Sequence, residues 1–246
     1  MTSTGSPEPP PATFILVPGF WIGGWAWDEV AEPLRKAGHR VEAVTLPGLE
    51  DRDAPRAGIR LDDHIAAVAE LVITLGPDVI LVAHSGAGPV VYAVTDQLPG
   101  QIRRAVYVDS GPLPAGTAIR PDLDPAATEF PPPTWAEFEA TGTSLAGMDE
   151  ELRAEFRRRA VPHPAGPARD PLHLTGSGRE NVPITVITSS FTSGEAARMA
   201  SEGHPYFSEL ARLPVTYVDL PTGHWPMWTR PADLAAELAR AAAAGR

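Results

Sequence analysis

The sequence contains no cysteine among its 246 residues. This absence excludes disulfide bonds, thiolate nucleophiles and zinc sites built on cysteine ligands. It is compatible with a reducing compartment, and we expect a cytoplasmic protein. Any catalytic nucleophile must come from another residue type.

Long hydrophobic runs are also missing, since no apolar stretch approaches the roughly 20 residues that a membrane-spanning helix needs. Residues 1–12 are rich in proline and have neither the basic cluster nor the apolar segment of a secretory signal. We expect them to form a disordered tail ahead of a soluble domain that does not bind membranes.

Basic side chains are outnumbered, with 20 Lys and Arg against 31 Asp and Glu and a formal net charge of −11. Such a charge repels phosphate backbones and anionic lipids, so nucleic acid is not an expected partner.

The length suits one α/β domain with an insertion. We expect a small-molecule substrate as partner, and the sequence leaves the oligomeric state open.

Short apolar runs alternate with segments of helical periodicity along most of the chain. The pattern predicts strands at 13–17, 41–44, 79–83, 105–108, 183–188 and 215–220. It predicts helices at 25–37, 61–75, 86–97, 195–201, 206–212 and 232–243. This alternation favours a mostly parallel sheet of about six strands with helices on both faces.

The alternation breaks at residues 112–181, which are rich in proline and glycine around two helical pieces at 135–140 and 148–160. The stretch is too long for an ordinary loop. We expect a helical lid inserted into a core formed by residues 13–111 and 182–246.

The strongest local motif is the turn Ala83-His84-Ser85-Gly86-Ala87, where an apolar strand runs directly into a helix. This form is typical of a nucleophile elbow, whose strained turn needs small residues two positions before and after the nucleophile. Alanine fills both outer positions, where glycine is usual. The motif predicts Ser85 as nucleophile and the Gly86 N–H as an oxyanion donor at a helix start. The alternative is a tightly packed strand-to-helix junction without chemistry.

A second oxyanion donor is expected in the loop after the first strand, which reads Pro18-Gly19-Phe20-Trp21. We choose the backbone N–H of Phe20, and Trp21 is the alternative. The segment PGFWIGGWAW also fits a hydrophobic anchor for the following helix.

His224 is the candidate base among the seven histidines, because TGHW follows the last strand and a flexible Gly223 precedes it. His84 adjoins Ser85, but neighbouring residues at an elbow point apart, so we expect it to pack beneath the oxyanion loop. The other histidines of helices and loops are expected at the surface: His39, His64, His173 and His204.

The acid of the predicted triad has more than one candidate. The residues just after the strand at 183–188 contain no carboxylate, and the nearest is Glu195. Asp109 ends the strand at 105–108, where an unpaired carboxylate would be costly, so a histidine partner is expected. We choose Asp109, with Glu195 and Asp219 as alternatives and a turn cap as its rival role.

Several apolar side chains are candidates for a substrate pocket beneath the lid: Trp21, Trp135, Met227 and Trp228. His163, within VPHP, is a candidate contact from the lid. Packing in the core explains each apolar candidate equally well. No metal or cofactor site is expected.

Taken with the elbow, two longer stretches carry a family resemblance. FILVPGFWIGGWAWDEVAEPL resembles the opening strand, oxyanion loop and Trp-bearing helix of the α/β-hydrolase superfamily, in its compact branch of plant methyl esterases and hydroxynitrile lyases. GHWPMWTRP resembles the catalytic-histidine segment of that branch. The resemblance implies an α/β-hydrolase fold with Ser85 as nucleophile and His224 as base. The choice of Asp109 as the acid of the Ser85–His224–Asp109 triad departs from the usual place of the acid in this branch.

Departures from the family narrow the chemistry. Pro18 replaces the usual histidine before the oxyanion loop, which leaves the backbone donors usable. Hydroxynitrile lyases of this branch carry a lysine after the catalytic histidine, whereas this chain has Trp225 there and only Lys36 elsewhere. Related dehalogenases share the proposed place of the acid but use an aspartate where this chain has Ser85.

Together these features predict a serine hydrolase that cleaves a carboxylic ester, lactone or related acyl bond of a small, largely apolar substrate through an acyl-enzyme. Two alternatives stay open at this level. One is a hydrolase-like ligand receptor, and the other is a carbon–carbon bond hydrolase or another enzyme of secondary metabolism on the same fold.

Overall fold

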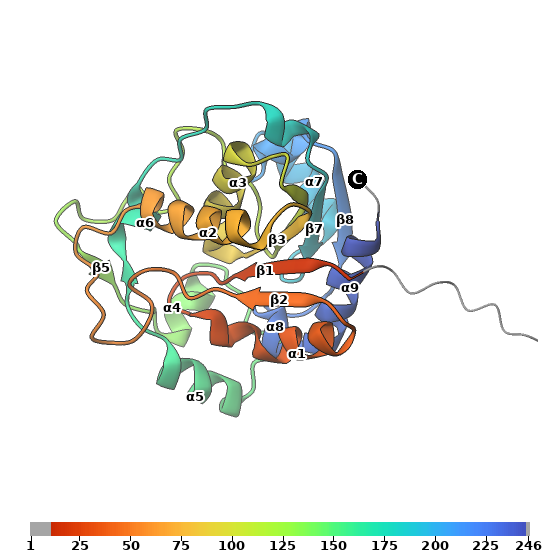
Figure 1. The fold of residues 1–246 in the computed structure, drawn as a ribbon. Coiled ribbons are helices and arrows are strands. Elements are labelled where there is room, and N and C mark those ends of the chain that lie inside the picture. Colours follow the sequence, from red (N-terminus) through yellow and green to blue (C-terminus); the bar gives the residue numbers. More distant parts are fainter. Residues whose placement is uncertain (1–10, 245–246) are drawn as a thin grey trace, which may run out of the picture.

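The computed structural model describes residues 11–244. Six parallel strands form the central sheet in the order β2-β1-β3-β4-β7-β8 (Figure 1). Their bounds are β1 Thr13–Val17, β2 Arg40–Ala43, β3 Val79–His84, β4 Ile102–Val108, β7 Ile184–Thr188 and β8 Val215–Asp219. The predicted parallel sheet of about six strands is confirmed.

The tail expected at residues 1–12 lies mostly outside the described residues, which begin at Pro11. Ala12 is buried, and its N–H donates to Nδ1 of His39 at 3.1 Å. Arg40 in turn donates its N–H to the carbonyl of Ala12. Ala12 is therefore part of the folded core rather than of a tail.

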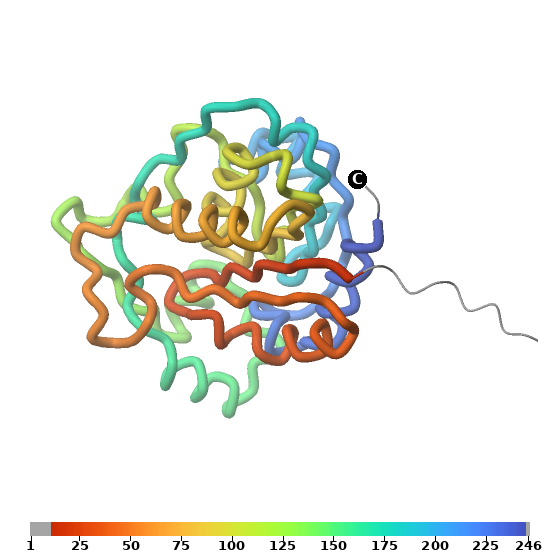
Figure 2. Tube along the Cα trace, viewed as in Figure 1, coloured from red at the N-terminus to blue at the C-terminus, as the bar shows by residue number. Residues whose placement is uncertain are grey.

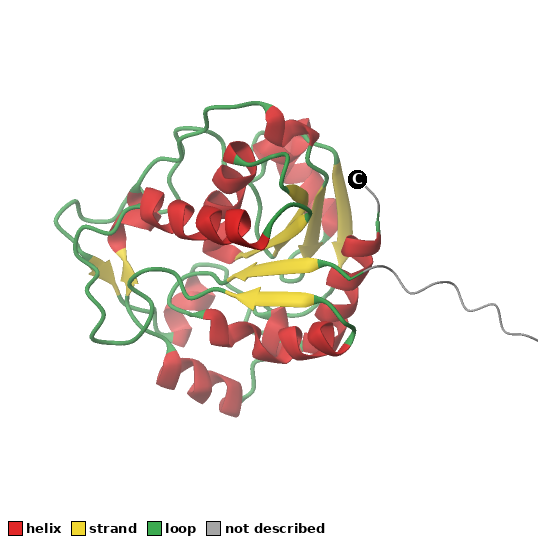
Figure 3. Ribbon diagram, viewed as in Figure 1, coloured by secondary structure: helices red, strands yellow, loops and turns green. Residues whose placement is uncertain are grey.

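Helices cover both faces of the sheet (Figure 3). One face carries α1 Asp28–Lys36, α8 Pro226–Thr229 and α9 Pro231–Ala243, and the other carries α2 Leu61–Leu75, α3 Gly88–Gln97 and α7 Ser193–Ser201. Short 3-10 helices are η1 Gly24–Trp27, η2 Ser85–Ala87, η3 Gly178–Asn181 and η4 Ser208–Arg212. The helix predicted at 206–212 is thus a 3-10 helix, and the helix predicted at 25–37 begins with one.

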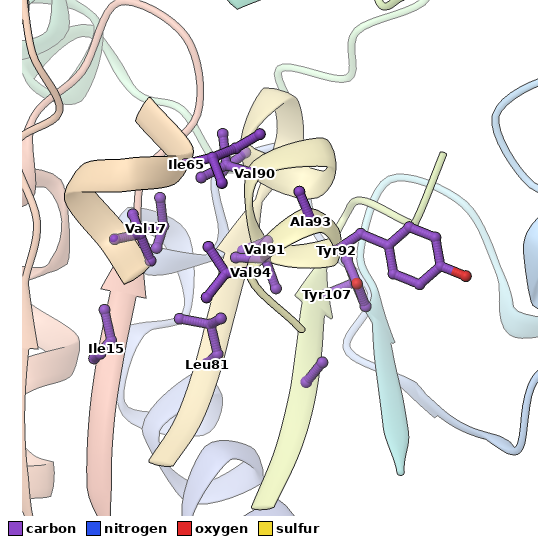
Figure 4. Packing of buried hydrophobic residues seen from close by; sticks show 14 of the residues in the cluster. Ile15, Val17, Ile65, Leu81, Val90, Val91, Tyr92, Ala93, Val94 and Tyr107 are labelled. Carbon is purple, nitrogen blue, oxygen red and sulfur yellow. The ribbon is translucent and has the colours of Figure 1, made fainter. Parts of the chain in front are cut away.

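Alternate residues of the strands supply the two hydrophobic cores. Ile15 and Leu81 point toward α2 and α3, where they pack with residues such as Val91 (Figure 4). Their sequence neighbours, including Phe14 and Ile80, face α1 and α9 on the other side. Because successive side chains of a strand point to opposite faces, apolar runs without alternation are what a sheet buried on both faces requires.

The strand order brings distant loops to one edge of the sheet. The chain passes from β1 out to β2 and then returns to β3 on the other side of β1. Such a reversal leaves a crevice at the carboxyl ends of the strands, where α/β proteins bind ligands. In the register, Val17 pairs with Ala83 and His84 pairs with Val108, so Ser85 and Asp109 directly follow paired residues.

The stretch 112–181 contains six short elements. They are β5 Glu129–Phe130, α4 Trp135–Ala140, α5 Glu150–Arg159, β6 His163–Pro164, α6 Ala165–Arg169 and η3. The helix expected at 135–140 is confirmed, and the helix expected at 148–160 is α5. The antiparallel pair β5 and β6 and the helix α6 were not predicted, because elements of two to five residues carry no readable periodicity.

This stretch lies against the loop that precedes α2, as the green-to-teal and orange traces show (Figure 2). The guanidinium of Arg56 in that loop is buried and donates from Nε to the carbonyl of Pro162 at 2.7 Å. The end of the stretch returns along α3, where the carboxylate of Asp96 accepts the N–H groups of Thr175 and Gly176. Only the earlier part of the stretch therefore lies near the sheet's carboxyl edge.

Among the described residues, no helix combines the length and apolar character needed to cross a membrane.

Candidate functional site

Ser85 occupies a sharp turn between β3 and α3. Its φ is +49°, a left-handed conformation that is uncommon for residues other than glycine. Ala83 and Ala87, two positions before and after it, are buried. Gly88 is required at the base of the turn, because a Cβ there would lie 2.3 Å from the carbonyl oxygen of Gly111. The strained turn presents the Ser85 side chain at the carboxyl edge of the sheet.

Three side chains from separate segments meet at this edge. The hydroxyl oxygen of Ser85 lies 2.8 Å from Nε2 of His224, and Nδ1 of His224 lies 2.6 Å from Oδ2 of Asp109. An ionised carboxylate only accepts hydrogen bonds, so Nδ1 donates to it. Nε2 of the neutral imidazole is then the acceptor for the Ser85 hydroxyl. The geometry couples the hydroxyl to a base that a carboxylate orients.

Asp109 is buried at the end of β4, also with a left-handed φ, of +45°. Its Oδ1 accepts the N–H groups of Ser189 and Ser190 at 3.1 and 2.9 Å, and the Ser190 hydroxyl donates to Oδ2 at 2.7 Å. Burial alone would raise the pKa of Asp109, but the hydrogen bond from His224 and the electrostatic attraction between the two groups, with the Ser190 donors, hold that pKa below its ordinary value. The carboxylate is therefore ionised beside the imidazole.

The other acid candidates lie elsewhere. Glu195 is exposed at the first turn of α7, where its carboxylate accepts the N–H of Thr192 at 2.8 Å in a capping box. Asp219, at the end of β8, accepts from Thr188 and Ser193. Both carboxylates accept hydrogen bonds from residues near them, at the start of α7 and at the ends of β7 and β8. Of the three candidates, only Asp109 contacts His224.

His84 is buried beneath the loop that follows β1, as expected from its place in the elbow. A Cβ on Gly19 of that loop would lie 3.0 Å from Nδ1 of His84. Nε2 of His84 donates to the backbone carbonyl of His224 at 2.7 Å. Burial, with the nearby His224, keeps the pKa of His84 far below its ordinary value, so the ring is neutral. His84 thereby ties the segment carrying His224 to the elbow.

The surface location expected for four further histidines is only half right. His173 and His204 are exposed. His39 and His64 are buried, and the prediction was wrong for them. His39 accepts the N–H of Ala12, and His64 donates from Nε2 to the carbonyl of Pro47 at 2.9 Å. Because a neutral imidazole with a satisfied nitrogen packs as an aromatic ring, helix and loop positions do not by themselves predict exposure.

The loop after β1 lies directly against the elbow. A Cβ on Gly86 would meet the Phe20 ring at 2.6 Å, so that ring covers the start of η2. Trp21 has a left-handed φ of +67°. Its N–H donates to Nδ1 of His163 at 3.3 Å, and its indole donates to the carbonyl of Phe130 at 3.2 Å. Since the Trp21 N–H is engaged, Phe20 is the better candidate for a backbone donor facing Ser85.

Two adjoining cavities open at Ser85. The smaller has a volume of about 240 Å³, and apart from the elbow its walls are mainly carbon, from Pro89, Leu113, Ile119 and Phe207. The larger has a volume of about 850 Å³. Ser85 and Phe20 line both cavities, whereas His224 lines only the larger of the two.

The candidate pocket residues are distributed unevenly around these cavities. Trp21 lines the larger cavity. Met227 is fully buried in the core on the α1 and α9 face, and His163 is buried behind the ring of Phe20, with ring centroids 4.6 Å apart. Neither side chain lines either cavity.

Trp135 and Trp228 belong to an aromatic cluster that also lies outside the two cavities. Trp135 packs on Phe156 of α5, with ring centroids 5.2 Å apart. Trp228 stacks on Trp25 at 5.7 Å, and the guanidinium of Arg159 lies 4.2 Å from the Trp25 ring. These contacts hold α5 against the core, which is why the tryptophans do not reach the site.

Several residues that line the cavities were not predicted from the sequence: Leu113, Ile119, Tyr206, Phe207 and Ser190. They lie in loops after β4, after β7 and before η4. No motif marks them, because the path of each loop depends on contacts between segments far apart in the chain. Within residues 11–244, no group of three or more His, Cys, Asp or Glu side chains is arranged to hold a metal ion.

Sequence comparison gives two informative relatives. A carbendazim hydrolyzing esterase of Nocardioides sp. (strain SG-4G) is 31% identical over 249 residues, which cover 93% of this chain and 98% of that protein. Methylesterase 18 of Arabidopsis thaliana is 34% identical over 110 residues, which cover 43% of this chain and 41% of that protein.

Structure comparison agrees with the sheet topology. An extracellular alpha/beta-hydrolase from a Paenibacillus species has a TM-score of 0.74 and 24% identity, and the match covers 96% of this chain and 100% of that one. The sequence pattern of the alpha/beta hydrolase family matches residues 14–237, which contain the whole central sheet except its first residue, Thr13. The chain therefore belongs to the alpha/beta hydrolase family.

Proposed function

We propose that this protein is a carboxylic ester hydrolase that forms an acyl-enzyme on Ser85. The observation that carries the proposal is the hydrogen-bonded series from Ser85 through His224 to Asp109, which opens on an apolar cavity. The names of the two sequence relatives, an esterase and a methylesterase, support the same reaction class. The substrate is a small molecule that carries an acyl group on an alcohol.

In the first step, the Ser85 oxygen attacks the ester carbonyl carbon while Nε2 of His224 takes the hydroxyl proton. Asp109 holds the imidazole in the tautomer that accepts this proton, and its charge stabilises the imidazolium that forms. The proton then passes from Nε2 to the alcohol oxygen as the bond between carbon and that oxygen breaks. The alcohol leaves, and the acyl group stays on Ser85.

The negative charge that develops on the carbonyl oxygen is stabilised by the backbone N–H groups of Phe20 and Gly86. The choice of Phe20 is supported by the neighbouring residue, because the N–H of Trp21 already donates to His163 and is not free to hold the oxyanion. The start of η2 and α3 adds favourable potential at Gly86. One donor of this kind is worth about 3 to 4 kcal/mol in comparable enzymes.

In the second step, His224 takes a proton from water, and the hydroxide attacks the acyl carbon. The tetrahedral intermediate expels the Ser85 oxygen, which regains the proton from Nε2. The products are the carboxylic acid and the free enzyme. Side chains and water supply every proton and electron pair, so the proposed cycle uses no cofactor.

The test is a fluorophosphonate label, mapped by mass spectrometry, together with steady-state hydrolysis of a phenyl ester. We expect label only on Ser85, and turnover that falls by about 10⁴-fold or more in Ser85→Ala. Retained turnover in that variant would remove Ser85 from the reaction. The unfolding midpoint of Ser85→Ala should match that of the unsubstituted protein, and this match would show that the substitution leaves the fold intact.

The same assay, extended to lactones and diketones as substrates, separates the alternatives. A hydrolase-like receptor would bind the ester tightly and stop after one turnover. A lactonase or carbon–carbon bond hydrolase would label at Ser85 but prefer lactones or diketones over open-chain esters.

A cytoplasmic location stays a prediction from the sequence, and the Paenibacillus relative is described as extracellular.

A further inference from the structure

We propose that the two cavities at Ser85 divide the substrate, so that the smaller cavity holds the acyl group and the larger holds the alcohol. This assignment rests on the proposed ester hydrolysis. It predicts a substrate whose acid part is uncharged, apolar and limited in size, whereas its alcohol part is variable.

The position of His224 decides the orientation. The alcohol oxygen must receive the proton from Nε2 of His224 as it leaves, so the alcohol lies on the same side of the carbonyl carbon as that ring. His224 lines the larger cavity and not the smaller one. The two cavities adjoin, and the residues that line both include Ser85 and Phe20, which the proposed mechanism places at the carbonyl group, together with Asp109, Ile119, Tyr206 and Phe207.

The chemistry of the smaller cavity fits an apolar acyl group. Leu113 is buried in its wall, and Pro89 lies in that wall as well. Ile119 and Phe207, which it shares with the larger cavity, add further carbon surface. The hydroxyl groups in its lining already have acceptors, because Ser110 donates to the carbonyl of Ser85 at 2.6 Å and Tyr206 donates to that of Ile119 at 3.0 Å. The Asp109 carboxylate, which also lines this cavity, already accepts from His224 and Ser190. A charged or strongly polar acid part would lose its hydration without gaining a partner.

The volume of about 240 Å³ sets the size of this group. A dry protein cavity of about 150 Å³ holds benzene, and each water-sized group takes about 30 Å³ more. The smaller cavity thus accommodates an aryl or branched acyl group of roughly six to nine carbons.

The larger cavity has a different character. Its walls combine apolar side chains such as Phe138, Phe191 and Met199 with polar ones. The polar ones are Thr141, Thr143 and His204, together with Arg120 and Asp122, which form an ion pair at 2.8 Å. Mixed walls and the larger volume suit alcohols that are bulky and that carry apolar or hydrogen-bonding groups. The alcohol side therefore imposes a weaker size limit than the acyl side.

Two series of esters test the assignment on the intact protein. The first keeps phenol as the alcohol and varies the acid through acetate, butyrate, hexanoate, benzoate and decanoate. The second keeps butyrate as the acid and varies the alcohol through phenol, 2-naphthol and 4-phenylphenol, whose acidities are similar. We expect kcat/KM to rise about fourfold per methylene from acetate to hexanoate, since each buried methylene contributes that factor. It should fall for decanoate and change little along the alcohol series.

Substitutions on the two sides give matched controls. Leu113 lines only the smaller cavity and Thr143 only the larger. Leu113→Trp should lower kcat/KM for phenyl benzoate and hexanoate by about tenfold or more while sparing phenyl acetate. Leu113→Ala should move the optimum toward decanoate. Thr143→Trp should lower the rate for 4-phenylphenyl butyrate only.

The outcomes separate this inference from the proposed function. If Ser85 takes no fluorophosphonate label and no ester is hydrolysed, both proposals fail. If esters are hydrolysed but Leu113 variants alter the alcohol series, or the acyl series is flat, the division of the substrate is wrong and ester hydrolysis stands. Should Leu113→Trp not fold, Leu113→Ala decides, because an unchanged acyl optimum in that variant also overturns the assignment.

Discussion

The backbone N–H of Trp21 donates a hydrogen bond to Nδ1 of His163 at 3.3 Å, across 142 positions of the chain. Trp21 has a left-handed φ of +67°, which a bulky residue adopts only where its surroundings hold it. The imidazole accepts at Nδ1 because burial, with the nearby His64 and Arg56, keeps the pKa of His163 well below its ordinary value. A residue of β6 thereby fixes the loop that carries Phe20.

The first prediction concerns this contact. His163→Ala should lower kcat by about tenfold while KM changes by less than about threefold, because a displaced Phe20 N–H loses part of the 10²- to 10³-fold effect of an oxyanion donor. His163→Asn, whose amide oxygen can accept the same N–H, should recover part of the loss. Ester hydrolysis by the three proteins is the measurement.

The control for this prediction is His173→Ala, which removes an exposed histidine of the same stretch. It should leave both constants unchanged. A higher KM with an unchanged kcat in His163→Ala would mean that His163 shapes the pocket and does not position the loop.

The second prediction compares the two acids that the sequence offered. Asp109→Asn should lower kcat by about 10⁴-fold, since the amide would favour the tautomer of His224 that cannot accept the Ser85 proton. Glu195→Gln should leave kcat close to that of the unsubstituted protein, because Glu195 caps α7 at the surface. Equal losses in both variants, measured with a phenyl ester, would refute the assignment of the acid.

The third prediction concerns pH and stability. Burial lowers the pKa of His64 from 6.5 to about 4, although the carbonyl of Pro47 and the charges of Asp63 and Glu50 act in the opposite direction. Between these two values the unfolded chain binds a proton at His64 that the folded protein does not. The free energy of unfolding therefore falls as pH decreases from 6.5 toward 4, by about 2 kcal/mol at pH 5 from this residue alone.

Urea unfolding at pH 7.5 and pH 5 measures this effect. His64→Gln, whose side-chain amide can still donate to Pro47, should lose less stability than the unsubstituted protein between the two pH values. His204→Gln, at an exposed position, should behave like the unsubstituted protein. If all three lose the same stability, His64 is not a source of the acid sensitivity.

The fourth prediction tests the packing at the base of the elbow. Gly88→Ala should destabilise the protein by about 1 to 3 kcal/mol, because the added Cβ would lie 2.3 Å from the backbone oxygen of Gly111 and the chain must shift. Ester hydrolysis should fall as well, since the shift moves the turn that carries Ser85. The matched variant is Gly100→Ala, where an added Cβ meets nothing within 4 Å. Similar urea midpoints for the two variants would contradict the prediction.

Local sequence was sufficient for the features that depend on neighbours in the chain. The apolar runs predicted the six strands of the sheet to within a few residues, because burial on both faces leaves no polar alternation. The elbow at Ser85 was readable because a strained turn demands small residues at Ala83 and Ala87. The segment with His224 was readable from its position after the last strand.

Contacts between distant segments decided the rest. The sequence offered Asp109, Glu195 and Asp219 as acids. The choice depends on which carboxylate lies beside His224, which the pairing of β4 with its neighbours and the hydrogen bond of His84 to the His224 carbonyl decide in the folded chain. Trp135 and Trp228 are candidate pocket residues from the sequence, but they pack against the aromatic cluster at α5. Leu113 and Phe207, which lie in loops without a recognisable motif, line the cavities instead. The chain's own periodicity fixes strands and the elbow, whereas side chains 100 or more positions apart, such as Trp21 and His163, meet only because the folded sheet brings them together.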